Sequence, residues 1–386
     1  MMTKIFNYIV YSLLITVLFS FNFSEVSYAK EPINNQKKFI GAYKVGNFND
    51  SSWTSLYNAI ALDNGNALIF GEYIQEFDAK TNKFYKYKTT YTPSGHMPDI
   101  TIVKNNKKSI LTFLLDPDVR KLKTSQFVVK EYNPITKEYK ELKNIVIDSF
   151  EAGIKNAIKL DENKVFLYVS NGRYYIYDIA NNSISKRMSF ENNLYKSYGW
   201  NTKIGIEKLD NGNFLIFGLG FGKKDDNLKK SNYVFEYSPK NNNIKIVGEL
   251  VENRNSGVVH SYRLDDENII VFGGGVQEKN NSIQIKTVEK YNIKNGTSKI
   301  IGELPSGVHS LFSIGKKWIF VKNRGILNAE KVFYDFKTNK FSKLKYSEII
   351  KSENPILLEL KDGSILFVGG IVYGRYTKKA YRYYWE

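Results

Sequence analysis

Short apolar runs alternate with polar turns along most of the chain, and the same arrangement returns at wide intervals. Residues 62–71 read LDNGNALIFG and residues 209–218 read LDNGNFLIFG, while residues 264–274 and 360–370 are two looser copies. Asp and Asn side chains hydrogen-bond to the backbone of such turns, and glycine tolerates a positive φ angle there. The pattern therefore predicts pairs of short antiparallel strands joined by tight turns.

A second signature follows each copy. Residues 77–84 read FDAKTNKF and residues 334–341 read YDFKTNKF. Four tyrosines open variants of the same turn, namely Tyr132, Tyr177, Tyr237 and Tyr291. Each unit thus holds two tight turns and four strands, and no helical period of 3.6 residues runs through residues 30–386. The sequence predicts an all-β protein.

Seven apolar positions are equivalent in these units, namely Leu68, Leu111, Phe166, Leu215, Ile270, Ile319 and Leu366. The steps between them are 43, 55, 49, 55, 49 and 47 residues. A repeat of this length is typical of β-propellers, in which each repeat forms one four-stranded blade. The spacing predicts seven blades, with six as the alternative if the divergent second or third unit is not a blade.

The apolar strand, Asp-Gly turn, strand ending in Gly-Gly and following Tyr-Asp resemble the kelch family of β-propellers. The resemblance covers nearly all of residues 30–386, although the second, third and sixth units lack the glycine pair. It implies one domain in which residues 38–43, similar to the outer strands at 244–249 and 299–303, complete the last blade. Such a strand closes the ring and leaves no exposed sheet edge.

The first 29 residues are expected to be a signal peptide. An early lysine precedes a nearly uninterrupted apolar stretch at residues 13–23, and Ser27-Tyr28-Ala29 has the small residues that signal peptidase requires. The stretch is shorter than the roughly 20 residues that a membrane-spanning helix needs. Cleavage after Ala29, secretion and the lack of a transmembrane span are therefore predicted.

The amino-acid composition limits the partners, metals and nucleophiles that the chain can use. There are 56 Lys and Arg residues against 39 Asp and Glu residues, which gives a formal net charge of +17 and favours anionic partners. The chain has no cysteine and three histidines, so disulfides, thiol nucleophiles and Cys-ligated metals are excluded, and no cofactor or metal is expected. Copper-radical oxidases of the kelch fold need a Tyr–Cys crosslink, which this chain cannot form. Nucleic-acid binding is not expected, because export and the lack of a recognition motif argue against it.

A ligand is expected on the face that carries the longer and less regular connections, which are residues 113–126, 218–231, 273–287 and 370–379. Seven candidate residues fall in or beside these connections, namely Trp53, Arg120, Trp200, Arg254, His260, His309 and Arg375. Aromatic faces suit sugar rings, and arginine suits carboxylate or phosphate groups. The alternative is that the tryptophans pack between blades and the histidines stabilise them.

These observations predict a secreted, monomeric propeller that binds a glycan, a surface polymer or a protein partner, without catalytic residues. The alternative is a metal-independent carbohydrate-active enzyme. It rests on a resemblance to kelch-type sialic acid mutarotases, which open the ring of an acidic sugar. In that case Arg254 or Arg375 would hold the sugar carboxylate, and His260 or His309 would move the proton.

Overall fold

The computed structural model describes the chain in segments that together cover most of the repeats. The described residues are 41–47, 58–70, 74–87, 100–106, 109–115, 125–142, 144–147, 154–170, 172–190, 195–197, 200–223, 232–278, 281–304, 308–314, 318–323, 332–335, 338, 340–343, 355–372 and 375–384. Within these segments all regular structure is β-strand, so the prediction of an all-β fold is confirmed. The same segments contain no helix of the length and apolarity needed to cross a membrane. The predicted signal peptide lies outside them.

The first four sheets follow one another along the chain. Sheet 1 consists of β2 (Asn58–Ala61), β3 (Ala67–Phe70), β4 (Ile74–Asp78) and β5 (Lys83–Lys86). Sheet 2 consists of β6 (Ile100–Asn106), β7 (Ser109–Leu115), β8 (Ser125–Asn133), β9 (Glu138–Glu141) and β10 (Ile145–Ile147). Sheet 3 consists of β11 (Asn156–Lys159), β12 (Lys164–Ser170), β13 (Arg173–Asp178), β14 (Ser183–Ile184) and β15 (Met188–Ser189). Sheet 4 consists of β18 (Gly205–Lys208), β19 (Phe214–Phe217), β21 (Tyr233–Ser238) and β22 (Asn243–Glu249).

Three further sheets and two small strand pairs complete the described structure. Sheet 5 consists of β17 (Trp200–Lys203), β23 (Ser256–Arg263), β24 (Asn268–Glu278), β25 (Asn281–Gln284), β26 (Thr287–Asn292) and β27 (Thr297–Glu303). Sheet 6 consists of β28 (Val308–Ile314), β29 (Trp318–Asn323), β30 (Val332–Asp335) and β31 (Lys340–Lys343). Sheet 7 consists of β32 (Ile356–Glu359), β33 (Ile365–Val368), β36 (Lys379–Tyr384) and β1 (Gly41–Asn47). The two-stranded pairs are β16 (Tyr195–Ser197) with β20 (Phe221–Lys223) and β34 (Ile371–Val372) with β35 (Arg375–Tyr376).

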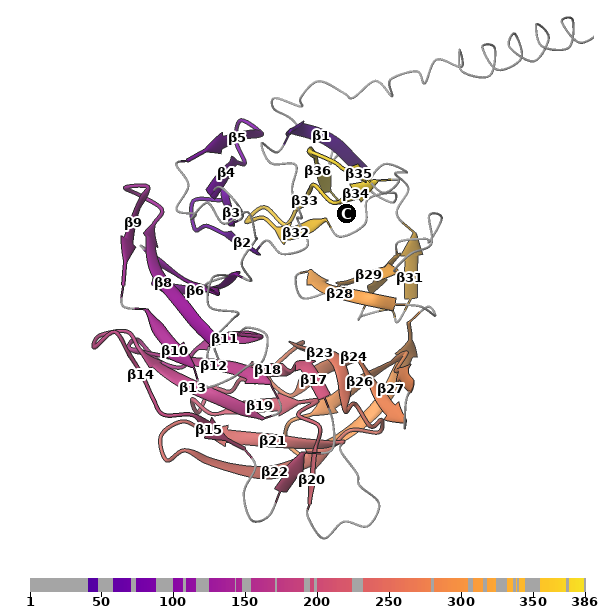
Figure 1. Ribbon diagram of the computed structural model, residues 1–386. Coiled ribbons are helices and arrows are strands. Elements are labelled where there is room, and N and C mark those ends of the chain that lie inside the picture. Colours follow the sequence, from indigo (N-terminus) through magenta and orange to yellow (C-terminus); the bar gives the residue numbers. More distant parts are fainter. Residues whose placement is uncertain are drawn as a thin grey trace, which may run out of the picture.

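The seven sheets succeed one another around a ring in chain order, as the colours of Figure 1 show. This is the arrangement of a β-propeller. Each of the seven apolar anchors predicted from the sequence lies in the second strand of one sheet. The number of blades in the whole chain stays a prediction.

The hydrophobic core lies between neighbouring sheets. The second strands β3, β19 and β33 are buried along their whole length, because sheets cover both of their faces. One apolar cluster joins sheets 1 and 2, a second joins sheets 2 and 3, and a third joins sheets 3 and 4. Others join sheets 4 and 5 and sheets 7 and 1. A strand covered on both faces has no polar side to expose, which is why these strands appear as unbroken apolar runs in the sequence.

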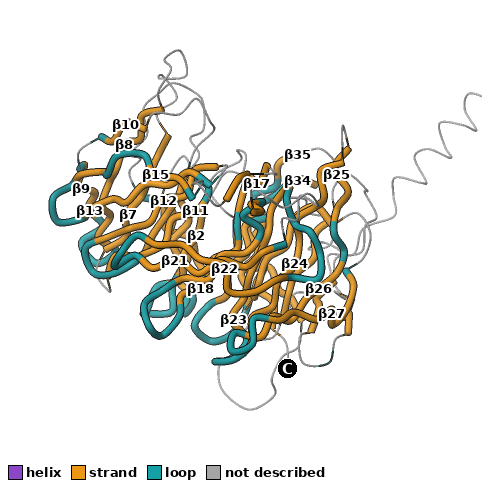
Figure 2. Tube along the Cα trace, turned by 90° about the horizontal axis from the view of Figure 1, so that it is seen from below, coloured by secondary structure: helices purple, strands orange, loops and turns teal. Residues whose placement is uncertain are grey.

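The tight turns have the chemistry that the sequence predicted. Gly65 and Gly212 adopt φ angles of 94° and 83°, in the region that favours glycine. Asn64 Oδ1 accepts a hydrogen bond of 3.0 Å from the backbone N–H of Asn66. Most of the described turns lie on one side of the ring, the tight-turn side, whereas β17, β25, β34 and β35 lie towards the opposite loop side (Figure 2).

The N-terminal strand closes the ring as predicted and continues beyond its predicted end, while the predicted residues 38–40 lie outside the described residues. The sequence placed this strand at residues 38–43, whereas β1 spans Gly41–Asn47. It pairs antiparallel with β36, with Tyr43 opposite Arg382. Strands from the two ends of the sequence therefore share one sheet (Figure 1).

The connections predicted as irregular loops contain additional strands. In the segment 273–287, β24 continues as far as Glu278 and turns back through β25. In the segment 370–379, β34 pairs with β35, and in 218–231 β20 pairs with β16. Backbone groups that a loop would leave to solvent are paired in these strands.

Candidate functional site

The connection between sheets 3 and 4 reaches the inner edge of sheet 5. Its strand β17 pairs with β23 in parallel, with Trp200 opposite Ser256 and Lys203 opposite Val258. It also contacts β12 of sheet 3. Because β23 is otherwise the innermost strand of sheet 5, β17 forms an extra strand towards the centre of the ring. This placement brings Lys203 beside β23.

Lys203 is exposed to solvent on β17, a strand that contacts β23 and β12. Its side chain keeps solvent-accessible surface, yet burial by the surrounding protein lowers the pKa of its amine. A group at the centre of a ring of sheets satisfies both observations, since solvent reaches it while protein displaces most of its hydration. An ammonium group in such a place is held less firmly in its charged form.

His260 is half-buried on β23, where its ring stacks on Phe272 with centroids 5.4 Å apart and an angle of 12° between the planes. Burial lowers the pKa of His260 to about 3, and the positive charge of Lys203 contributes in the same direction. The imidazole is therefore neutral at physiological pH. A neutral imidazole donates one hydrogen bond and accepts another.

Glu207 lies on β18, the inner strand of sheet 4. The hydroxyl of Ser261 on β23 donates a hydrogen bond of 2.7 Å to Glu207 Oε1. Burial raises the pKa of Glu207, and the hydrogen bond from Ser261 and the charge of Arg263 oppose that rise. The raised pKa makes Glu207 a better proton donor near neutral pH than an exposed glutamic acid.

Tyr262 connects this group to a third sheet. Burial raises the pKa of Tyr262 to about 12, helped by the negative charges of Glu359 on β32 and of Glu207. We call Lys203, Glu207, His260, Ser261 and Tyr262 the inner-strand cluster. Its strands β17, β18 and β23 lie at the inner ends of sheets 4 and 5 (Figure 1). Clusters of titratable groups with shifted pKa values are typical of functional sites.

Arg254 has a structural environment, which corrects its prediction as a ligand contact. Both Arg254 and Glu289 have side chains with 0% exposure, and Arg254 Nη2 lies 2.9 Å from Glu289 Oε1. The guanidinium also donates to the backbone carbonyls of Gly273 and Thr287. A side chain buried in this way offers no surface to a ligand.

The other predicted residues are placed as follows. Arg375 is exposed on β35, in the hairpin on the loop side. Trp200 lies on β17 and His309 on β28, but their side chains are outside the described structure. Trp53 and Arg120 lie outside the described residues altogether. Of the seven candidates, only His260 is shown with its side chain in the inner-strand cluster.

Sequence reasoning missed Lys203, Glu207, Ser261 and Tyr262. For Glu207 a signal was present, because it lies opposite the anchor Leu215. The residues opposite four other anchors are apolar or aromatic, namely Ile60, Val103, Ile158 and Leu358. The two remaining anchors, Ile270 and Ile319, lie opposite Tyr262 and Ser313, so the charge of Glu207 distinguishes it from all its equivalents.

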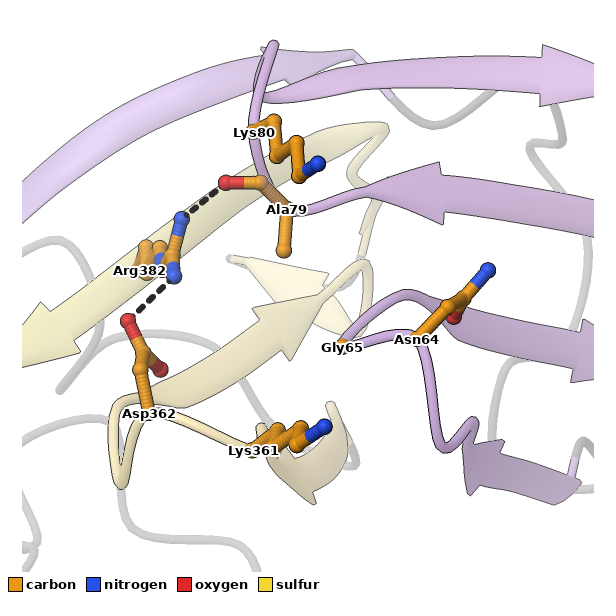
Figure 3. Close-up of a pocket in the computed structure, with 7 residues that line it drawn as sticks. All are labelled: Asn64, Gly65, Ala79, Lys80, Lys361, Asp362 and Arg382. Carbon is orange, nitrogen blue, oxygen red and sulfur yellow. Dashed lines mark hydrogen bonds and ion pairs between the residues drawn. The ribbon is translucent and has the colours of Figure 1, made fainter.

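A pocket of about 360 Å³ lies elsewhere, on the tight-turn side between sheets 7 and 1. Figure 3 shows that Arg382 links Asp362 of sheet 7 to the carbonyl of Ala79 in sheet 1. Arg382 also binds Ser364 and Asn82, so its hydrogen-bonding groups are engaged within the protein. We therefore interpret this place as a ring-closing contact.

No protein-family model matches the chain, and no curated protein matches it. Among solved structures, it is similar to a fungal alcohol oxidase of the AA5 family in complex with copper. The identity is 13%, the TM-score is 0.56, and the match covers 91% of this chain and 76% of the oxidase. At this identity the likeness shows the fold. The similar structure is that of an enzyme, which stands against the prediction of a non-catalytic binding module.

The copper of that oxidase does not fit the residues of this chain. The chain has no cysteine with which a tyrosine could be crosslinked. Within the described segments, no group of three or more His, Cys, Asp or Glu side chains is placed to hold a metal ion. We derive no copper chemistry for this chain.

Proposed function

We propose that this protein is a kelch-type propeller that catalyses ring-opening of an acidic carbohydrate by acid–base chemistry, with the inner-strand cluster as its active site. The observation that carries the proposal is the position of Lys203, Glu207 and His260 on adjacent inner strands of sheets 4 and 5. Each of the three has a pKa shifted towards its neutral form. The kelch-like repeats and the enzymatic nature of the similar structure support the same assignment.

Ring-opening needs one group that takes a proton and another that gives one. Lys203 in its neutral form takes the proton of the anomeric hydroxyl, and protonated Glu207 gives a proton to the ring oxygen. The bond between the anomeric carbon and the ring oxygen breaks, and its electrons pass to the ring oxygen while the carbonyl forms. Reclosure on the other face of the carbonyl reverses both transfers and restores the enzyme.

The remaining residues orient the substrate. Neutral His260 hydrogen-bonds to a sugar hydroxyl without adding charge to the site. Arg375 keeps its predicted role as the contact for the sugar carboxylate, because it is exposed on the loop side. Arg254 takes no part in binding, since it is buried against Glu289.

The test is the exchange rate between the two anomers of a sialic acid, measured by NMR with and without the purified protein. The protein should accelerate this exchange, and Lys203→Met and Glu207→Gln should each lower the catalysed rate about 100-fold, the usual share of general acid–base catalysis. Lys299→Met is the matched control, because Lys299 is exposed on the outer strand β27 and should leave the rate unchanged. No acceleration by the wild-type chain would refute the proposal.

Secretion is part of the same proposal, because an extracellular sugar acid would be met outside the cell. It rests on the signal-like residues 1–29 and the predicted cleavage after Ala29. The net charge of +17 favours encounter with an anionic substrate.

A further inference from the structure

The contact between sheets 4 and 5 is unusually close beside Glu207. A β-carbon added to Gly205 would lie 2.9 Å from both the Cβ and the Oγ of Ser261. Real β-carbons do not approach other atoms so closely, so glycine at this position allows the two inner strands to meet. The close approach brings the Ser261 hydroxyl within 2.7 Å of Glu207 Oε1, although the two residues are 54 positions apart.

We infer that Ser261 is a positioning residue, which holds the carboxyl group of Glu207 in place across the junction of sheets 4 and 5. This inference rests on the proposed function, in which Glu207 is the proton donor. The hydroxyl fixes Oε1 of the carboxyl group by donating a hydrogen bond to it. A hydrogen bond donated to a carboxylate also favours the ionised form, so Ser261 limits how far burial raises the pKa of Glu207.

Other titratable groups lie on the elements around this carboxyl group, and of these Arg263 acts on it. The titratable and charged residues on the elements packed here are Arg263, Tyr262 and His260 on β23, Lys203 on β17 and Glu359 on β32. Arg263 favours the charged form of Glu207 through its positive charge and its backbone. Ser261 differs from them because it is uncharged, so replacing it removes one hydrogen bond and leaves the net charge of the site unchanged.

The experiment is an NMR titration of glutamate side chains labelled with ¹³C, in which Glu207→Gln identifies the Glu207 signal. Ser261→Ala should raise the pKa of Glu207 by about one unit, the effect expected for one hydrogen bond to a charged group. The pair Ser261→Thr and Ser261→Val gives a second comparison, because their side chains have similar shapes and only threonine keeps the hydroxyl. Threonine should keep the wild-type titration and valine should shift it upwards.

The anomer-exchange rate provides the functional measurement. If Ser261 positions the proton donor, the pH profile of the rate in Ser261→Ala should move upwards with the pKa of Glu207, while KM changes little. A purely structural serine would lower the rate equally at every pH and leave the titration unchanged, which would overturn the inference. A shifted titration in a wild-type chain without exchange activity would refute the proposed function and support the role of Ser261 towards Glu207.

Discussion

The pKa of the His260 side chain depends on where the residue lies in the ring. It stacks on Phe272 and lies near the positive charge of Lys203, so both its burial and its neighbour disfavour the imidazolium form. The histidine was predicted either as a ligand contact or as a residue that stabilises its blade. Its stacking fits the second role, and its nearness to Lys203 fits the first.

The shifted pKa of His260 predicts a dependence of stability on pH. The pKa is about 3 in the folded chain, against an ordinary value of 6.5, so between these values only the unfolded chain binds the proton. Stability is therefore lost as the pH falls below 6.5. From pH 7 to pH 5 this group should lower the free energy of unfolding by at most about 2 kcal/mol.

Urea unfolding of the wild type and of His260→Asn at both pH values measures this effect. The variant should lose less stability on acidification than the wild type, because asparagine does not titrate. An equal loss in both proteins would contradict the assignment of a neutral, desolvated imidazole.

At the scale of the elements, the ion pair of Arg254 and Glu289 holds the connection between sheets 4 and 5 in place. Glu289 on β26 accepts hydrogen bonds from the backbone N–H groups of Val251 and Glu252, and it is paired with Arg254. The connection between sheets 4 and 5 is thereby attached to β26, which lies two strands away from β23 in sheet 5. This attachment lies directly before β23, which carries His260 and Ser261.

Removal of Arg254 should therefore destabilise the fold strongly. Arg254→Met leaves the carboxylate of Glu289 buried without its partner, and the free energy of unfolding should fall by about 3–5 kcal/mol. The double variant with Glu289→Gln should recover part of this loss. Arg263→Met is the control, because its partner Asp210 is 83% exposed and an exposed ion pair contributes little to stability.

Equilibrium unfolding in urea measures all three variants. If Arg254→Met were no less stable than Arg263→Met, the guanidinium would not be an internal support, and a ligand-binding role would have to be considered again.

Contacts between inner strands link neighbouring sheets on the tight-turn side. Four cations at equivalent positions of their inner strands bind the preceding sheet: Lys104, Lys159, Lys208 and Arg263. Lys104 lies 2.5 Å from Asp63, and Lys208 donates to the carbonyl of Leu160 over 3.1 Å. Lys159 binds the carbonyl of Asn105, and Arg263 binds Asp210. Part of the basic charge therefore joins the repeats together.

At the scale of the whole molecule, Arg382 joins the last sheet to the first. It is 5% exposed and binds Asp362, Ser364, Asn82 and the carbonyl of Ala79, residues that come from both ends of the sequence (Figure 3). Together with the pairing of β1 and β36, it holds the ring closed without a disulfide.

Arg382→Met should consequently weaken the ring at its junction. Loss of the charged hydrogen bonds should lower the free energy of unfolding by about 1.5–3 kcal/mol. Hydrogen exchange should become faster in β1 and β36 than in sheets 3 and 4, because opening begins where the chain ends meet. Uniformly faster exchange over all sheets would argue against a local closing contact. The control variant Lys299→Met should leave the exchange pattern of the wild type unchanged.

The sequence by itself determined the repeating strands, their turns and the closing strand. These features depend on local chemistry and on apolar runs such as Ala67–Phe70, which are buried along their whole length in β3, β19 and β33. Strand β1 continues to Asn47, beyond its predicted end at residue 43, because the pairing with β36 decides where it ends and no local signal marks that point.

Only the tertiary structure decided the candidate site. Lys203 comes near His260 because β17 crosses to the inner edge of sheet 5, and Ser261 reaches Glu207 because Gly205 lets two sheets approach. Arg254 looked like a ligand contact in the sequence and proved to be buried, because its partner Glu289 lies 35 residues away. Contacts between residues so distant in the chain depend on how the sheets pack, and no local pattern encodes them.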